Sequence, residues 1–126
     1  SMDFFPTVLR VAGLQPDPDT PLDGENLLPI LDGSGSLERD AIFFHYPNYA
    51  FHGENRLAGA VRLGDYKLIE FYDDGSVELY DVVNDVGETR DLAHDMPERA
   101  AAMRGRLDAW LLEVGARMPR PIPAGS

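Results

Sequence analysis

Two histidines, His45 and His52, are the side chains of this 126-residue chain best suited to chemistry, and they lie seven positions apart among aromatic residues. Imidazole can bind a metal ion or transfer a proton near neutral pH. The spacing matches no metal-binding motif, however, and no third ligand accompanies the pair. We therefore favour a structural or exposed role for both histidines, with contact to a substrate as the alternative.

Acidic residues gather in two segments that could be mistaken for metal sites. The first contains Asp17, Asp19 and Asp23, and the second contains Asp81, Asn84, Asp85 and Glu88. The first is interrupted by prolines and lacks the spacing of a calcium loop with its final Glu. The second follows a predicted strand, where short polar side chains cap backbone groups. The sequence thus predicts a solvated connector, a capped loop and no metal site.

Two cations, Arg62 and Lys67, are predicted to lie opposite each other across a β-hairpin. Like charges in directly opposed positions destabilise a sheet unless an anion lies between them. Glu78 on the same face, or Glu88 from the following loop, could supply a carboxylate. A structural ion pair is one interpretation of Arg62, Lys67 and Glu88, and an anionic ligand is the other.

Several classes of protein are disfavoured by composition. The formal net charge is −11, and the 11 Lys and Arg residues are scattered, which argues against nucleic acid or an anionic membrane as partner. No apolar run is long enough to span a membrane. The chain has no Cys, no G-x-S-x-G turn and no glycine-rich phosphate loop, so no motif in it predicts an enzyme active site.

The N-terminal third predicts a short arm rather than a compact core. Apolar residues at helical spacing (Phe5, Val8, Leu9 and Ala12) predict a helix over residues 4–12, with Asp3 as its N-cap and Gly13 just beyond its end. An extended connector follows. The Gly-Ser repeat at residues 33–36 is the best internal boundary, so we expect an arm over residues 1–33 and a separate domain over residues 34–126.

The second segment predicts an antiparallel sheet of about four strands. Residues 41–46 have strand composition. Two hairpin turns are predicted to connect the strands that follow: a type II′ turn at Gly64-Asp65 and a type I′ turn at Asp74-Gly75. These turns define two sheet faces. The expected core face carries Val61, Leu63, Tyr66, Leu68, Tyr72, Val77 and Leu79, interrupted by Glu70, and the other face is only half apolar.

A long C-terminal helix completes the predicted fold. The sequence from Asp95 to Glu98 has a capping-box pattern, and apolar residues including Met103, Leu107 and Trp110 recur at helical spacing as far as Met118. Trp110 is expected to be largely buried against the sheet, with Arg104 on the solvent side. The predicted fold class is α+β, with one long helix packed on the sheet and a helical and extended N-terminal arm.

These segments resemble, in the same order along the chain, the C-terminal part of proteins of the sulfatase family. D-F-F-P-T-V-L-R (residues 3–10) is similar to the helix that ends the large α/β domain, and D-G-E-N-L-L-P-I-L (23–31) is similar to the linker after it. F-H-Y-P (44–47), R-L-G-D-Y-K-L-I (62–69) and L-Y-D-x-x-N-D-x-x-E (79–88) resemble successive pieces of the small C-terminal subdomain. The order and spacing cover nearly the whole chain.

The resemblance implies a sulfuric ester hydrolase of the alkaline-phosphatase-like superfamily as the parent protein. In that family a residue of a C-x-P-x-R motif matures to formylglycine beside a bound calcium ion. The motif is missing here, so both cofactors are expected only in an N-terminal catalytic domain outside this chain. Loops of the C-terminal subdomain can contact substrate, which makes His45, Tyr46, Tyr49 and His52 the substrate-contact candidates.

The predicted function is therefore the C-terminal subdomain of a sulfatase, catalytically silent alone, which completes the parent fold and one wall of its cleft. The alternatives are a free-standing acidic domain that binds protein or carbohydrate, and the same subdomain of a related phosphoesterase. The expected partner is the catalytic domain, and the N-terminal arm could form a homodimer. The sequence gives no compartment, although many bacterial family members are exported to the periplasm or secreted.

Overall fold

The computed structural model describes residues 2–48 and 55–120. The chain forms two compact units, Ser1–Asp40 and Ala41–Ser126. The predicted boundary after Gly33 falls inside the first unit, because the carboxylate of Glu25 accepts hydrogen bonds from the backbone N–H groups of Glu38 and Arg39. Residues 34–40 therefore fold with the N-terminal arm.

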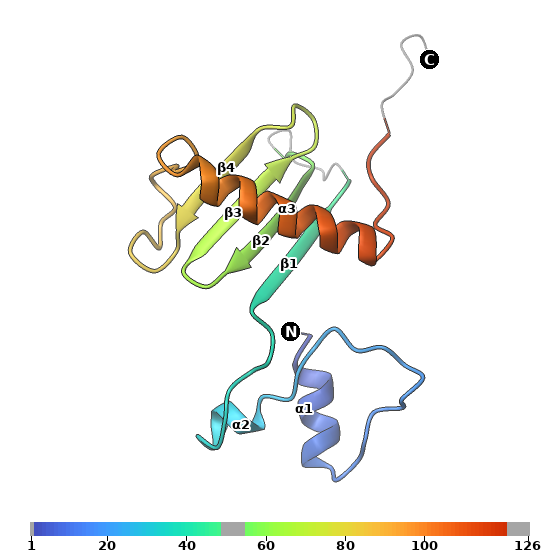
Figure 1. Cartoon of the computed structure of the whole chain (residues 1–126). Coiled ribbons are helices and arrows are strands. Elements are labelled where there is room, and N and C mark those ends of the chain that lie inside the picture. The colour runs from blue at the N-terminus through green and yellow to red at the C-terminus, as the bar shows by residue number, and fades with distance from the viewer. Residues whose placement is uncertain (1, 49–54, 121–126) are drawn as a thin grey trace. The chain divides into compact units, whose positions relative to one another are not determined.

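The second unit is an antiparallel sheet covered on one face by a long helix (Figure 1). Its strands are β1 (Ala41–Tyr46), β2 (Ala58–Leu63), β3 (Tyr66–Phe71) and β4 (Val77–Asp81), and they lie side by side in that order. Helix α3 (Pro97–Glu113) follows. The predicted α+β class, with four antiparallel strands and one long C-terminal helix, is confirmed.

The two hairpin turns differ from each other in how well the sequence predicts them. Leu63 pairs with Tyr66, and Gly64 has φ of +58°, so the predicted two-residue turn is confirmed. The second turn is longer: Glu70 pairs with Val77, and the Phe71 N–H bonds the Ser76 carbonyl, which leaves a four-residue loop with Gly75 alone at positive φ. The predicted type I′ turn is wrong, since it requires two residues at positive φ.

The hydrophobic core lies between α3 and the predicted core face of the sheet. Its fully buried side chains are those of Val61, Leu68, Leu79 and Leu107. Trp110 is only half-buried, because it lies toward the β1 side and stacks on Phe43 with 4.9 Å between ring centroids. The prediction that Trp110 packs against the sheet face with Val61, Leu68 and Leu79 is confirmed in part, since Trp110 is half-buried against this core, and Leu107 is the fully buried residue of α3.

Both predicted ends of α3 need correction. Met96 precedes the helix without a side-chain cap, and Asp95 instead pairs with Arg90, so no capping box forms. At the other end, Gly115 has φ of +61°, and the N–H groups of Gly115 and Ala116 bond the carbonyls of Leu112 and Leu111. This is a Schellman motif, which ends the helix before Met118.

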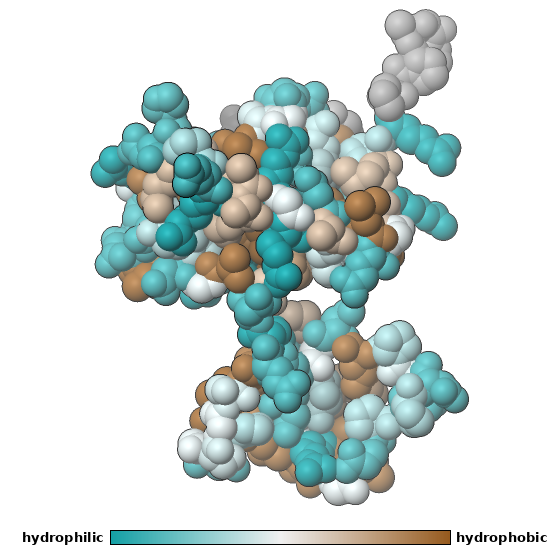
Figure 2. Space-filling model, in the orientation of Figure 1, coloured by the Kyte–Doolittle hydropathy of each residue, from teal (hydrophilic) through white to brown (hydrophobic). Residues whose placement is uncertain are grey.

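The first unit contains α1 (Phe4–Val11) and the single-turn α2 (Leu28–Leu31). Asp3 does not cap α1; its carboxylate binds Arg39 and the Glu25 N–H instead. Within α1, Pro6 is the buried residue, and brown apolar side chains remain at the surface of this unit (Figure 2). Across residues 2–48 and 55–120, no helix is long and apolar enough to cross a membrane.

Candidate functional site

His45 lies near the end of β1, on the sheet face that α3 covers, and both of its ring nitrogens have partners. Nδ1 is 2.8 Å from the Tyr72 hydroxyl, and Nε2 is 3.1 Å from the Arg117 backbone carbonyl. Because a carbonyl only accepts, Nε2–H is the donor to Arg117, and in the neutral imidazole Nδ1 accepts from Tyr72. His45 thus ties the end of β1 to the segment after α3.

The surroundings of Tyr72 keep its hydroxyl protonated, so that it can donate a hydrogen bond to His45. Burial raises the pKa of Tyr72 to about 12, and the carboxylates of Glu70 and Asp108 contribute in the same direction. Space for its ring exists because residue 59 is glycine: a Cβ there would lie 2.2 Å from the Tyr72 hydroxyl oxygen. The same Cβ would lie 3.2 Å from Leu107 Cδ2, so Gly59 permits both the His45–Tyr72 bond and the core packing.

Gly59→Ala is expected to displace the Tyr72 hydroxyl and to destabilise the second unit by about 1–3 kcal/mol, as overpacking in a close-packed interior does. Urea unfolding followed by circular dichroism measures the loss. Gly105→Ala is the matched control, because no atom lies within 4 Å of a Cβ at Gly105 and alanine is the better helix former. Equal stability of the two variants would contradict the close contact at Gly59.

Of the four substrate-contact candidates, the structure describes His45 and Tyr46. His45 and Tyr46 are neighbours on β1 and point to opposite faces of the sheet. Tyr46 is 45% exposed on the face away from α3. Tyr49 and His52 lie outside the described residues, so their role as substrate contacts stays a prediction.

An open hollow of about 1090 Å³ lies between the residues that follow β1 and the segment that follows α3. Pro47, Asn48 and Leu57 line one part of it, and residues 117–120 line the rest. Two of the lining residues, Arg117 and Arg120, are cationic, although the chain as a whole carries a net charge of −11. Guanidinium groups bind anionic oxygens through paired N–H donors, so this hollow is chemically suited to a sulfate or carboxylate group.

The cationic pair of Arg62 and Lys67, on the sheet face away from α3, has the predicted cross-strand geometry. Arg62 lies opposite Lys67, and the Lys67 ammonium forms an ion pair with the Glu88 carboxylate. Glu88 has φ of +52°, an uncommon conformation for a non-glycine residue, and it brings this carboxylate over the sheet. Arg62 is exposed. The lysine charge is therefore compensated from within the chain.

The acidic loop after β4 uses its carboxylates to bind its own backbone. Asp81 accepts hydrogen bonds from the N–H groups of Val83 and Asn84, and Asp85 accepts from those of Thr89 and Arg90. The pKa of Asp81 is lowered by the hydrogen bond from the Asn84 side-chain amide and by the backbone bonds, and the pKa of Asp85 is lowered by the bonds from Arg90 and Thr89. Among the residues that the structure describes, no group of three or more His, Cys, Asp or Glu side chains could hold a metal ion.

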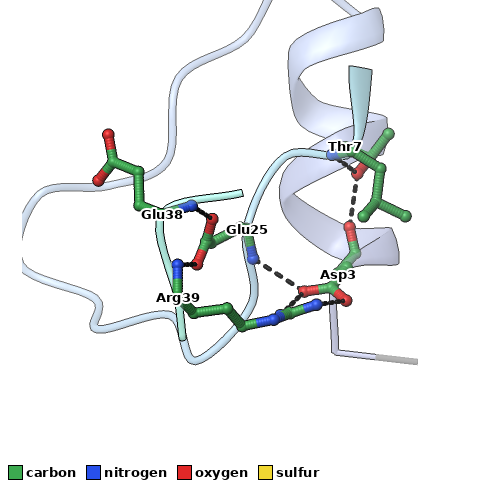
Figure 3. Close-up of polar contacts among 6 residues, drawn as sticks. Asp3, Thr7, Glu25, Glu38 and Arg39 are labelled. Atoms are coloured by element: carbon green, nitrogen blue, oxygen red, sulfur yellow. Dashed lines mark hydrogen bonds and ion pairs between the residues drawn. The ribbon is translucent and has the colours of Figure 1, made fainter. Parts of the chain in front are cut away.

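A clamp in the first unit was not predicted from the sequence. The Arg39 guanidinium binds both carboxylate oxygens of Asp3, at 2.5 and 2.7 Å, and Asp3 also accepts the Glu25 N–H at 2.9 Å (Figure 3). The Thr7 hydroxyl joins in, since it donates to the Asp3 carbonyl and accepts from the Leu27 N–H. The partners lie up to 36 residues apart, so no local pattern reveals them.

Acid is expected to open this clamp. The hydrogen bonds from Arg39 and from the Glu25 backbone lower the pKa of Asp3 from 3.8 to about 2. A depressed pKa stabilises the folded unit above pH 3.8, and this stabilisation is lost as the pH falls from 3.8 through about 2. A titration of the Asp3 carboxyl carbon by NMR measures the midpoint. Arg39→Ala should return it toward 3.8, Arg10→Ala should not, and an ordinary midpoint in the native chain would contradict the clamp.

The fold class of the second unit is a two-layer α+β module, in which one helix covers an antiparallel sheet and charged side chains bond the loops. The chain belongs to the sulfatase family: the family described as "N-sulphoglucosamine sulphohydrolase, C-terminal" matches residues 1–114. The chain is 29% identical to a sulfatase of Formosa agariphila over 137 aligned residues. This alignment covers 92% of this chain and 23% of that protein. It is 43% identical to human arylsulfatase A over 76 aligned residues, and this alignment covers 60% of this chain and 14% of arylsulfatase A.

Solved structures agree with this assignment. The structure of BT4656 in complex with its substrate D-glucosamine-2-N,6-O-disulfate matches with a TM-score of 0.74 and 27% identity. That match covers 93% of this chain and 24% of the BT4656 chain. The chain therefore spans about a quarter of the length of such relatives, and it corresponds to the C-terminal region of a sulfatase.

Proposed function

We propose that this chain completes the fold of a larger sulfuric ester hydrolase and forms one wall of its substrate cleft, while catalysis belongs to another region of the parent polypeptide. The family match over residues 1–114, combined with coverage of only about a quarter of the relatives, is the observation that carries the proposal. The expected partner is the catalytic region of the same polypeptide.

The sequence does not fit formylglycine, and the residues that the structure describes do not fit calcium, the other cofactor that the family implies. Formylglycine arises from a C-x-P-x-R motif, and the sequence has neither that motif nor any Cys. Calcium needs six to eight oxygen ligands, and the described carboxylates are engaged in backbone capping and ion pairs rather than grouped for a metal. Any contribution of this chain to hydrolysis would be through binding and orientation of the substrate.

The cleft wall is proposed to include the hollow beside Arg117 and Arg120. These arginines suit a second anionic group on the substrate, away from the ester that is cleaved. Sulfated sugars are the substrate class that we favour, since the substrate named for BT4656 is a disulfated glucosamine. Tyr46, Tyr49 and His52 would contact the sugar, whereas His45 would position the end of β1 through Tyr72 and Arg117.

The proposal is tested by comparing the full-length parent with the 126-residue chain alone. The full-length protein should hydrolyse an aryl sulfate, and the isolated chain should not, because it lacks the nucleophile and metal that stabilise the transition state. In the parent, Arg120→Ala should raise KM for a disulfated sugar and leave KM for a small aryl sulfate unchanged. Calcium-dependent hydrolysis by the isolated chain would overturn the proposal.

Two alternatives remain distinguishable. A related phosphoesterase would prefer an aryl phosphate to the aryl sulfate in the same assay. A free-standing binding domain is favoured by one observation, the apolar sheet face away from α3, which includes Phe44 at 58% exposure. A reading frame that carries C-x-P-x-R upstream of Asp3 would exclude the free-standing domain.

The apolar side chains of α1 are proposed to pack within the catalytic region of the parent. Phe4, Phe5, Val8 and Val11 are 58–69% exposed in this chain, and leaving several such side chains in water is unfavourable. In the isolated chain they are expected to form a homodimer through the N-terminal arm. Sedimentation at several concentrations, with a chain that starts at Ser34 as the control, would show whether the arm is responsible.

A further inference from the structure

The chain contains three Asp-Gly pairs, and an Asp-Gly pair is a place where a protein backbone can rearrange without an enzyme. The pairs are Asp23-Gly24, Asp32-Gly33 and Asp74-Gly75. In this reaction the backbone nitrogen of the glycine attacks the side-chain carbonyl carbon of the aspartate, and glycine has no Cβ to shield that nitrogen. As sequence the three pairs are equivalent, so a difference in their reactivity has to come from the fold.

Hydrogen bonds hold both reacting groups of Asp74-Gly75. The Asp74 carboxylate accepts bonds from the N–H and the hydroxyl of Ser76, at 2.9 and 2.6 Å, and it pairs with Arg56. The Gly75 N–H, which contains the attacking nitrogen, donates to the Phe71 carbonyl at 2.9 Å. The bonds from the Ser76 hydroxyl and N–H lower the pKa of Asp74, which favours the ionised carboxylate, a poor electrophile. This pair is therefore protected from the reaction.

The pair Asp32-Gly33 is restrained in the same way but less tightly. The Asp32 carboxylate accepts the Ser34 N–H at 2.9 Å. The Gly33 N–H donates to the Ile30 carbonyl at 3.4 Å, which is long for such a bond. Hydrogen bonds from the side chain and backbone of Ser34 lower the pKa of Asp32. We therefore expect this pair to react slowly, although faster than the pair at Asp74.

Neither reacting group of Asp23-Gly24 is held in this way. Within the part of the chain that the structure describes, no hydrogen bond or ion pair is found for the Asp23 carboxylate, and no acceptor is found for the Gly24 N–H. Asp23 is exposed. Gly24 and Asn26 also help to line an open hollow of about 560 Å³ in the first unit. Water can therefore reach this pair from outside.

We propose that Asp23 is a site of spontaneous modification, at which aspartate converts to isoaspartate through a cyclic succinimide. The Gly24 nitrogen forms a bond to Asp23 Cγ, and the carboxyl O–H group and the amide proton leave together as one water molecule. A second water molecule then opens the ring at either of its two carbonyls. Opening at Cγ restores aspartate, whereas opening at the backbone carbonyl leaves Gly24 joined through Cγ, which is isoaspartate. The inference is independent of the proposed function.

The product is expected to loosen the clamp around Asp3, because the isomer adds one carbon atom to the backbone directly before Gly24. A Cβ at Gly24 would lie 2.2 Å from the Met2 carbonyl oxygen, so Gly24 packs closely against the residue before Asp3. The next residue, Glu25, donates its N–H to Asp3, and its carboxylate accepts two backbone N–H groups (Figure 3). A longer backbone shifts Gly24 or Glu25 relative to Asp3 and so weakens the pairing of Asp3 with Arg39.

Incubation of the 126-residue chain at mildly acidic pH, followed by proteolysis and mass spectrometry, tests the inference. Isoaspartate should accumulate severalfold faster at Asp23 than at Asp32, and most slowly at Asp74, within one sample. In guanidinium chloride the three pairs should react alike, because the fold no longer distinguishes them. Asp23→Glu should remove the product at this position, since the corresponding ring is larger and forms more slowly. Asp32→Glu is the matched control and should leave the rate at Asp23 unchanged.

Two further measurements separate the steps of the inference. The isomerised chain should show an Asp3 midpoint nearer to 3.8 than the fresh chain does, and an unchanged midpoint would contradict the link to the clamp. Ser76→Ala should accelerate isomerisation at Asp74, because it removes the hydroxyl bond to that carboxylate. Equal rates at the three pairs in the folded chain, or a faster reaction at Asp32 or Asp74, would overturn the proposal.

Discussion

Leu107→Ala is expected to lower the unfolding free energy of the second unit by about 2–5 kcal/mol. Leu107 is fully buried between α3 and the sheet, where it lies among Val61, Leu68 and Leu79. Truncation removes apolar contacts and leaves a cavity that the surrounding strands cannot close. A domain of this size has about 5–15 kcal/mol of stability in total, so the loss is severe. Urea unfolding monitored by far-ultraviolet circular dichroism measures it.

Leu112→Ala is the matched control for this result. Leu112 lies on the same helix and undergoes the same chemical change, but it is 83% exposed. Its substitution should change the unfolding free energy by less than about 0.5 kcal/mol, as surface changes usually do. If the two variants unfold at the same urea concentration, α3 does not pack on the sheet through Leu107.

Arg104→Ala is expected to cost about 3–5 kcal/mol, because it leaves a buried carboxylate without its partner. Glu70 is 7% exposed on the core face of β3, and its Oε1 lies 2.5 Å from the Arg104 guanidinium on α3. The arginine side chain is 45% exposed, which places the expected loss at the lower end of this range. Differential scanning calorimetry of the second unit would report the change as a lower midpoint.

The double variant Glu70→Met, Arg104→Met separates the cost of an orphaned charge from the value of the ion pair. When both partners become apolar, no buried charge remains, and most of the stability should return. Glu70→Met alone should be far milder than Arg104→Ala, since an exposed arginine can be solvated. A double variant as unstable as Arg104→Ala would show that the pair itself, rather than the buried charge, stabilises the fold.

The sequence predicts the faces of the sheet better than it predicts the turns. The second hairpin has a four-residue loop in place of the predicted two-residue turn, which moves the pairing of β3 with β4 by two residues. Side chains alternate with a period of two, so an even shift leaves every residue on its predicted face. Val61, Leu68 and Leu79 are accordingly buried as expected.

Predictions that depend on side-chain reach were less successful. Arg104 is at a solvent-side position by helical spacing, yet its long side chain reaches Glu70. Periodicity gives the direction of a Cα–Cβ bond and not the position of a flexible charged end. The capping roles predicted for Asp3 and Asp95 failed for a related reason, since both carboxylates bind arginines instead.

The candidate site was only partly accessible to sequence reasoning. The hairpin turn at Gly64-Asp65 was enough to predict Arg62 opposite Lys67. The partners of His45 are Tyr72 and Arg117, which lie 27 and 72 residues away in the chain. The requirement for glycine at position 59 depends on the same tertiary packing. A single sequence contains no local signal for contacts of this range.

The order of strands in the sheet also has a consequence for how the chain acquires its structure during synthesis. Each strand pairs with the one that precedes it in sequence, so the sheet can form progressively as β1 to β4 leave the ribosome. Helix α3 emerges last, on the order of seconds after β4 at about 5–20 residues per second. During that interval the sheet face that α3 later covers is bare, and this apolar surface makes the nascent chain prone to aggregation.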